Sequence, residues 1–143
     1  MVFSFLLSLI SLKIGLYELN KYKTINNKIK NFIYIYPLLF IFLFNNNNDY
    51  LFNIFFGAIT PLLIVHFIID IKEQELPDFI NITIALFAIL KILFDLMQNG
   101  FSMAIISYIL NAISLFVIYL LIAILSKGAL GGGDIKLIGA LGL

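Results

Sequence analysis

The chain has 143 residues, a formal net charge of +1 and no cysteine, and 62% of its residues are hydrophobic while 12% are charged. A soluble domain covers its surface with polar groups and has roughly a quarter of its residues charged, so this composition excludes a soluble globular enzyme, a disordered protein and a basic nucleic-acid-binding protein. The lack of cysteine excludes disulfides and thiolate metal sites, and the single histidine, His66, excludes a metal site built from several histidines. We therefore expect an integral membrane protein that binds no metal, cofactor or nucleic acid.

Long apolar runs predict an all-α fold, a polytopic transmembrane helical bundle with about five full spans plus the start of a sixth. The predicted full spans are residues 2–19, 32–44, 51–69, 79–97 and 101–125. The sixth helix is expected to begin at Asp134, after a glycine-rich loop.

The placement of lysine predicts how the spans are oriented. The loops after the first, third and fifth spans carry Lys21, Lys23, Lys28, Lys30, Lys72 and Lys127. The loops after the second and fourth spans carry no lysine. Because basic loops stay in the cytoplasm, we expect a multi-pass protein of the inner (cytoplasmic) membrane with its N-terminus outside. Asp70, which ends the third span, and Asp134 then lie on the same cytoplasmic face.

The last predicted helix is too short to cross a membrane. Nine residues follow Asp134 and give about 14 Å of helix, whereas the hydrocarbon core of a bilayer is about 30 Å thick. We therefore expect the chain to be truncated at its C-terminus. Residues 1–50 are interpreted as N-terminal hydrophobic helices with a short basic cytoplasmic loop, and residues 51–143 as the part that carries both aspartates.

Asp70 and Asp134 are the candidate catalytic pair. Acidic side chains at membrane depth are costly to desolvate and commonly functional. Two carboxylates held together share one proton, so that one activates a water and the other protonates a peptide carbonyl oxygen. The alternative interpretation makes Asp134 a helix N-cap after a flexible glycine turn, and makes Asp70 a solvated residue at a helix end.

Residues 69–78 have the pattern ID-x-K-x4-PD, and residues 128–142 read GALGGGDIKLIGALG. These segments resemble the two signatures of the type IV prepilin peptidase family, the GxGD membrane aspartic peptidases. The resemblance covers residues 51–143 and implies that Asp70 and Asp134 are the catalytic aspartates. It implies an endopeptidase that cleaves the leader of a prepilin or pseudopilin at the cytoplasmic face of the bilayer. The chain resembles the compact form, which lacks the cysteine-rich cytoplasmic domain, so N-methylation of the pilin is not implied.

The resemblance also suggests residues that contact the substrate. Gly131 and Gly133 would let the substrate backbone approach the second aspartate. Glu73 and Asp78 would attract the basic segment that ends such leaders. The alternatives are a plain exposed loop for both acids, and a helix cap for Asp78 after Pro77.

Other polar residues within the predicted spans have a structural and a functional interpretation. His66 lies four residues before the first candidate aspartate and either tunes it or packs in the bundle. Lys91 and Asp95 are spaced to pair with each other. Lys136 either tunes the aspartates, meets lipid phosphates or is an ordinary lysine of the cytoplasmic face. Asn81 begins a glycosylation sequon by pattern, which is discounted because it falls in a predicted span.

Two other functions remain open. The chain could be a small transporter or channel subunit that uses the paired acids as proton or cation ligands. Transport sites lie near the bilayer midplane, whereas both aspartates here fall at span ends, which favours the peptidase. The chain could also be an inactive fragment of the peptidase. The oligomeric state is left open.

Overall fold

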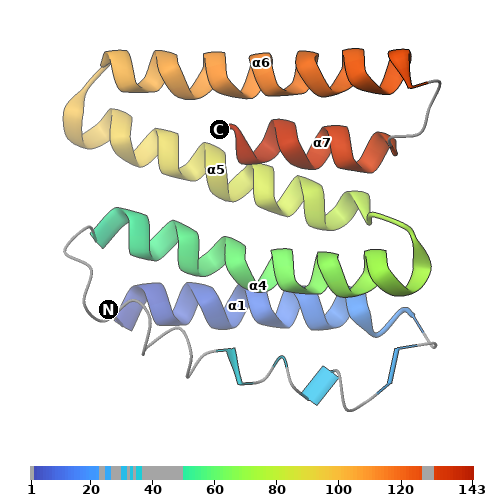
Figure 1. Cartoon of the computed structure of the whole chain (residues 1–143). Helices are drawn as coiled ribbons and strands as arrows, with labels where there is room; N and C mark the ends of the chain where they lie inside the picture. Colours follow the sequence, from blue (N-terminus) through green and yellow to red (C-terminus); the bar gives the residue numbers. More distant parts are fainter. Residues whose placement is uncertain are drawn as a thin grey trace. The chain divides into compact units, whose positions relative to one another are not determined.

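The computed structural model describes residues 2–22, 25–26, 30–31, 33, 35–36, 50–126 and 131–143. In this part of the chain the regular structure is helical, with no strand, which confirms the predicted all-α fold. The helices with defined ends are α1 (Val2–Leu19), α4 (Tyr50–Glu73), α5 (Asp78–Asn99), α6 (Met103–Leu125) and α7 (Gly132–Leu141) (Figure 1). Helices α1 and α4 belong to one compact unit, residues 1–76, and α5, α6 and α7 belong to a second, residues 77–143.

Three segments of the described part are long and apolar enough to cross a membrane, namely Ile54–Glu73, Asp78–Asn99 and Met103–Leu125. They support a helical membrane bundle, but their number is smaller than the five full spans expected. Helix α1 forms over the expected residues 2–19, but it is not among the three candidate membrane spans. Most of the expected span 32–44 lies outside the described residues.

Small side chains line the contact between α1 and α4 in the first unit. Ser8 and Ser11 are fully buried, and each hydroxyl donates to the carbonyl three residues earlier in its own helix, at 2.8 and 3.0 Å. Gly15 continues the same face of α1, and a Cβ placed on it would lie 2.9 Å from Val65 Cγ2 of α4. The two backbones therefore approach closely, as is common where small residues line helix contacts in membranes.

Gly15→Leu is expected to lower the free energy of unfolding by about 1–2 kcal/mol. Overpacking typically costs about 1–3 kcal/mol, and the gain in helix propensity over glycine offsets about 1 kcal/mol at most. Val65 is fully buried and β-branched, so it cannot move aside easily. Chemical unfolding in detergent micelles measures the loss. Val65→Ala should recover part of it, whereas Ile10→Leu, on an exposed face of α1, should have little effect.

Pro61 lies inside α4 and leaves one helical carbonyl without its usual donor. Proline has no N–H, so the carbonyl of Gly57, four residues earlier, receives no bond from residue 61. The hydroxyl of Tyr36 donates to that carbonyl at 3.1 Å. Tyr36 and Pro61 are both buried. A side-chain donor thus replaces the missing backbone bond, which is how a membrane helix accommodates an internal proline.

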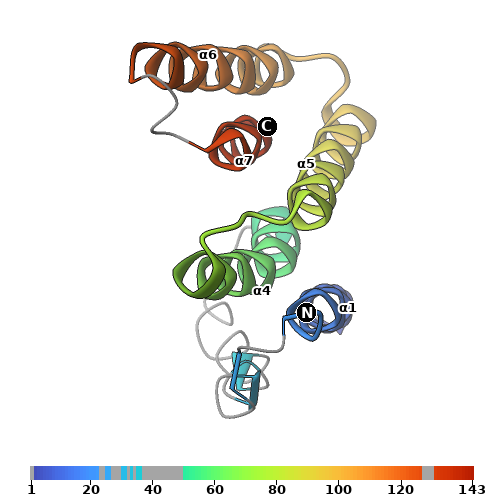
Figure 2. The same cartoon turned by 90° about the vertical axis from the view of Figure 1, so that its right-hand side faces the viewer.

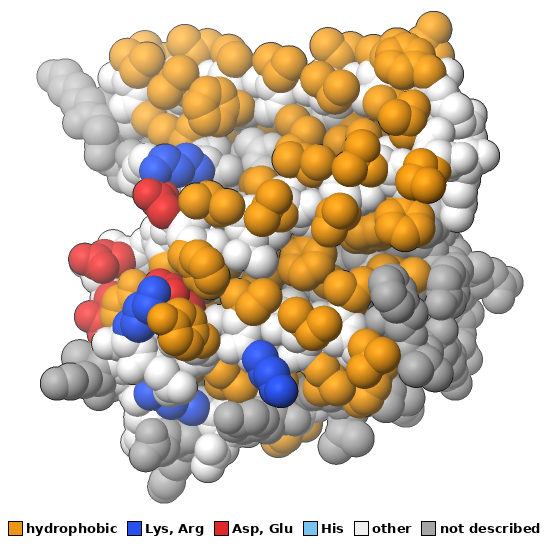
Figure 3. Space-filling view, turned by 180° about the vertical axis from the view of Figure 1, so that it is seen from behind, with side chains coloured by type: hydrophobic (Ala, Val, Ile, Leu, Met, Phe, Trp, Pro, Cys, Tyr) orange, Lys and Arg blue, Asp and Glu red, His pale blue; other side chains and the backbone are white. Residues whose placement is uncertain are grey.

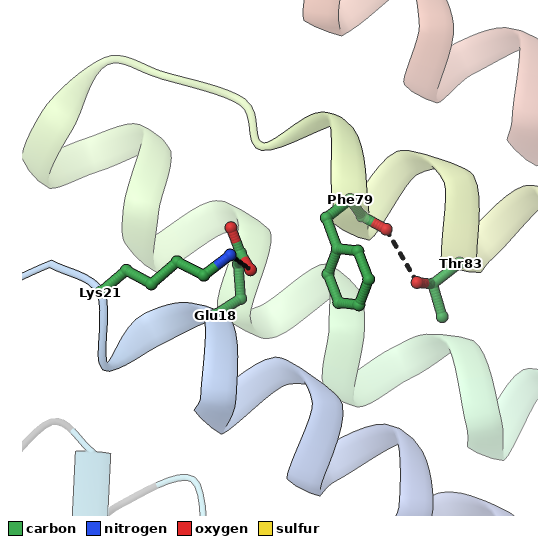
Figure 4. A network of polar contacts seen from close by, with 4 residues as sticks. All are labelled: Glu18, Lys21, Phe79 and Thr83. Atoms are coloured by element: carbon green, nitrogen blue, oxygen red, sulfur yellow. Dashed lines mark hydrogen bonds and ion pairs between the residues drawn. The ribbon is translucent and has the colours of Figure 1, made fainter.

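A buried acid lies at the end of α1. Glu18 is 5% exposed and accepts a hydrogen bond of 2.6 Å from the ammonium of Lys21 (Figure 4). The same ammonium lies 5.2 Å from the centroid of the Tyr17 ring. The hydrogen bond to Glu18 raises the pKa of Lys21. This lysine follows the last turn of α1, where a positive charge is favourable.

Helix α7 packs against both α5 and α6 in the second unit (Figures 1 and 2). Its approach to α6 is close, because a Cβ on Gly142 would lie 2.7 Å from the Cα of Ala112. One turn earlier, a Cβ on Gly139 would lie 3.2 Å from the ring of Phe116. The direct contact between α5 and α6 is smaller than either contact with α7. Helix α6 is therefore attached to this unit mainly through α7.

Most of α6 is exposed although it is apolar. Of its 23 residues, Ile105, Ala112 and Ala123 are buried. Apolar side chains also cover much of the surface of α5 and α6 seen in Figure 3. An apolar surface of this extent suits contact with lipid rather than with water.

Candidate active site

Asp134 lies in the first turn of α7. The helix begins at Gly132, with Gly131 as its N-cap, so Asp134 is the third helical residue and not the N-cap that the alternative interpretation expected. The extended backbone of Gly131 ends the preceding loop, and the amide of Asp134 donates to the Gly131 carbonyl at 3.1 Å. The carboxylate thus lies at a helix N-terminus, where free N–H groups and the helix dipole favour a negative charge.

Gly131 gives the Asp134 carboxylate room to fold back over the helix start. A Cβ built on Gly131 would lie 3.2 Å from Oδ2 of Asp134, closer than a side chain comfortably tolerates. The next residue differs, because a Cβ on Gly132 would meet nothing within 4 Å. The position of the Asp134 carboxylate is therefore a second reason for a glycine at position 131, besides the approach of substrate predicted from the sequence.

Gly131→Ala is expected to displace the Asp134 carboxylate by a few tenths of an ångström and to lower kcat for peptide cleavage by about threefold to tenfold, less than the roughly 100-fold that a displacement of about 1 Å can cost. Gly132→Ala is the matched control and should keep its activity, because its new methyl group enters open space. Equal losses in the two variants would mean that loop flexibility, and not the room beside the carboxylate, accounts for the glycine at position 131.

Asn81 of α5 holds the residue that precedes Asp134. Its Nδ2 donates to the Gly133 carbonyl at 3.3 Å, across 52 residues of sequence. Asn81 is 4% exposed, and its Oδ1 is buried with no hydrogen-bond partner among the described residues. Thr83 of the same helix differs, because its hydroxyl donates to the Phe79 carbonyl one turn earlier (Figure 4). The sequence marks Asn81 only as part of a sequon and carries no signal of this contact with Gly133.

Asp78 and Lys136 form an ion pair between the first turns of α5 and α7. The ammonium of Lys136 lies 2.7 Å from Oδ1 of Asp78, and both side chains are more than half exposed. Asp78 is the first residue of α5 and Pro77 is the N-cap, so the predicted cap role of Asp78 is wrong. An exposed pair of this kind contributes at most about 1 kcal/mol to stability. The ion pair shows that α5 and α7 begin at the same end of the unit.

Asp70 lies in the last turn of α4, in the other unit. Its side chain is exposed, whereas His66, one turn earlier, is 2% exposed. Helix α4 ends at Glu73 because Gln74 adopts a left-handed φ of 54°, and the amide of Gln74 donates to the Asp70 carbonyl at 2.9 Å. Glu73 is the last helical residue and is partly exposed. The pairing of Asp70 with Asp134 stays a prediction.

The two aspartates share one feature that bears on function. Asp134 lies on α7 close to the start of α5, because Gly133 and Lys136 both contact the first turn of that helix. Asp70 lies three residues before the end of the span Ile54–Glu73. Each acid is thus at the end of an apolar span and not at its middle.

An open groove of about 580 Å³ lies beside the Asn81 contact, within the second unit. Helix α5 lines it with Asn81 and Ala85, α6 with Ala112 and Phe116, and α7 with Gly139. Asp78 and Lys136 also line it. The groove is therefore apolar along its length and carries polar groups near the helix starts.

Lys91 lies on α5, well away from these groups. Its ammonium lies 3.7 Å from the centroid of the Tyr108 ring of α6, a cation–π contact. The pairing with Asp95 that the spacing suggested is not formed between these two described residues.

Comparison with protein families identifies a family model that covers more than half of the chain. The model of the type IV leader peptidase family matches residues 57–143, which include both aspartates and the glycine run before Asp134. Searches of curated proteins and of solved structures gave no significant match.

Proposed function

Because the chain belongs to the type IV leader peptidase family, we propose that it is a membrane aspartic endopeptidase that removes the leader from a prepilin-like or pseudopilin-like protein. The observation that carries the proposal is the setting of Asp134. This acid lies at a helix N-terminus, at the end of an apolar unit, with its backbone held by Asn81 and its carboxylate accommodated by Gly131.

Asp70 and Asp134 are proposed as the catalytic dyad, with one proton shared between them. The ionised carboxylate takes a proton from a water, whose oxygen attacks the carbonyl carbon of the scissile peptide. The protonated carboxyl donates its proton to the carbonyl oxygen. The tetrahedral intermediate then collapses, the C–N bond breaks, and the leaving amine takes the proton that came from the water. The two acids titrate as a pair, so neither role is assigned to one residue.

Chain connectivity supports the pairing of these acids. Residues 74–77 join α4 to α5, and the five residue steps from Glu73 to Asp78 reach at most about 18 Å even when fully extended. If α4 and α5 are consecutive membrane spans, the end of the first and the start of the second lie at the same membrane face. Asp70 is in the last turn of α4, and Asp134 is tied to the start of α5 through Gly133. Lysine placement makes this face the cytoplasmic one and places the N-terminus outside the inner membrane.

The substrate would reach the dyad from this face. The apolar helix of a pilin-like protein partitions into the bilayer and leaves its leader in the aqueous phase. Glu73 and Asp78 would attract a basic segment at the end of the leader, and both have exposed surface. Gly131 and Gly133 would leave room for the substrate backbone beside Asp134.

Processing of a pilin in membranes tests the proposal. The chain is co-expressed with a candidate prepilin, and the N-terminus of the mature pilin is read by mass spectrometry. We expect a single cut that separates the leader from the apolar helix. If the purified protein in liposomes instead carries a proton or cation current and cuts none of a panel of prepilins, the transporter interpretation is correct and the peptidase proposal is wrong.

A further inference from the structure

We propose that the groove between α5, α6 and α7 binds the first turns of the substrate's apolar helix, and that Asn81 Oδ1 accepts a backbone N–H from that helix. The inference rests on the proposed function and assigns it a docking site. Every residue involved belongs to the second unit.

The floor of the groove suits a helix. Two small residues, Ala85 of α5 and Ala140 of α7, line it together with larger apolar side chains. Small residues let two helix backbones approach closely in a membrane, where packing rather than water drives their association. The volume of about 580 Å³ is that of a site that holds a sizeable ligand.

The unpartnered oxygen of Asn81 favours a peptide, which carries N–H donors, as the ligand in the groove. The amide cannot be turned over, since Oδ1 would then face the Gly133 carbonyl oxygen that Nδ2 now contacts. Oδ1 is therefore left as a buried acceptor without a partner, which is unfavourable, and a donor in the groove meets it when the Asn81 side chain shifts toward the groove. The acyl chain of a lipid has no donor. The first turn of a helix has up to four free N–H groups, which makes it the occupant that fits both the apolar walls and the acceptor.

The position of Asn81 also sets the direction in which the helix lies. Asn81 is in the first turn of α5 and contacts Gly133, the residue before Asp134. A helix whose first turn meets Asn81 extends along α5 toward Ala85, away from Asp134. The peptide that precedes this helix then points toward Asp134, which is where the proposed cleavage takes place.

Cross-linking tests the groove independently of cleavage. The chain has no cysteine, so Ala85→Cys introduces its single thiol. It is combined with Asp134→Asn to keep the substrate intact, and with a prepilin that carries one cysteine at successive positions of its apolar helix. We expect a short bifunctional maleimide to join Ala85→Cys to positions three or four residues apart on one face of the substrate helix. Ala104→Cys, exposed on α6 and outside the groove, should give no such pattern.

Kinetics tests the same site in the active protein. Ala85→Phe should raise KM for the prepilin at least about tenfold with little change in kcat, because it fills the groove without touching the aspartates. Ala104→Phe should change neither constant.

Proline placed in turn at each of the first four positions of the substrate helix removes one N–H without breaking the helix. One position should lower kcat/KM by about tenfold with the wild-type enzyme, and the same proline should have little further effect with Asn81→Ala.

The outcomes separate the two proposals. If prepilin is cleaved but Ala85→Cys gives no cross-link and Ala85→Phe leaves KM unchanged, the groove proposal is wrong and the peptidase proposal stands. If the cross-link forms on one face of the substrate helix but no prepilin is cleaved, the groove is correct and the peptidase proposal fails. A groove filled by lipid, by another part of the protein or by a second copy would give neither the cross-link nor the proline effect.

Discussion

Asp134→Asn is expected to lower kcat for leader cleavage by at least about 100-fold, and Asp70→Asn should cause a loss of the same order. Asparagine keeps the size of the side chain but can neither take the proton from water nor return it to the leaving amine. KM should change little, because neither carboxylate is proposed to bind the leader. The double variant should be no worse than the poorer single variant, since the two acids act as one unit.

Asp95→Asn is the matched control for these variants. Asp95 is an aspartate on α5, it is partly exposed, and it has no place in the proposed site. Its replacement should leave kcat within about twofold of the wild-type value. The helical content of each variant, measured by circular dichroism, should equal that of the wild type. Full activity in either Asp70→Asn or Asp134→Asn would remove that residue from the mechanism.

Tyr36→Phe is expected to lower the free energy of unfolding by about 1–3 kcal/mol, the usual cost of a buried polar group left without a partner. The hydroxyl of Tyr36 donates a hydrogen bond to the Gly57 carbonyl. This bond replaces the one that a backbone N–H at position 61 would make if the residue were not proline. Phenylalanine fills the same space, so the loss reports the hydrogen bond and not a cavity. Chemical unfolding in detergent measures it, with Tyr17→Phe on the exposed face of α1 as the control.

A double-mutant cycle with Pro61→Ala identifies the cause. Alanine at position 61 supplies the backbone N–H that proline lacks, so the Gly57 carbonyl regains its helical donor. Tyr36→Phe should therefore cost much less in the Pro61→Ala background than in the wild type. Equal costs in both backgrounds would show that the tyrosine acts through packing and not through the carbonyl.

The ends of α5 could be predicted from the sequence because local chemistry fixes them, whereas α4 extends four residues past the predicted end at residue 69. The apolar run predicted over 79–97 is α5, which begins directly after Pro77 and ends before Gly100, whose φ of 67° favours glycine. The run predicted over 101–125 is α6, shifted by two residues at its start. Hydrophobicity predicts both segments, and for α5 a proline and a glycine predict the limits, whereas α6 is capped by Ser102 and Ser126.

The contacts that build the site could not be predicted in the same way. Asn81 meets Gly133 and Asp78 meets Lys136 across 52 and 58 residues of sequence. These pairs depend on which helices pack together, and apolar helices carry little information about their neighbours. The start of α7 was also misplaced by two residues, because three successive glycines carry no cap signal and the helix extends back to Gly132. The contact of Lys91 with Tyr108 could not be predicted for the same reason, because Tyr108 is on another helix.

Helix α7 carries Asp134 and is also the main attachment of α6 to its unit. Of the described helices it is the last to leave the ribosome. During translation α5 and α6 therefore enter the bilayer with little contact between them, and the second acid arrives only when α7 folds between them. Under the proposed function, a nascent chain has no proteolytic activity until that step. Assembly of the unit and activation of the enzyme are then a single event in biogenesis.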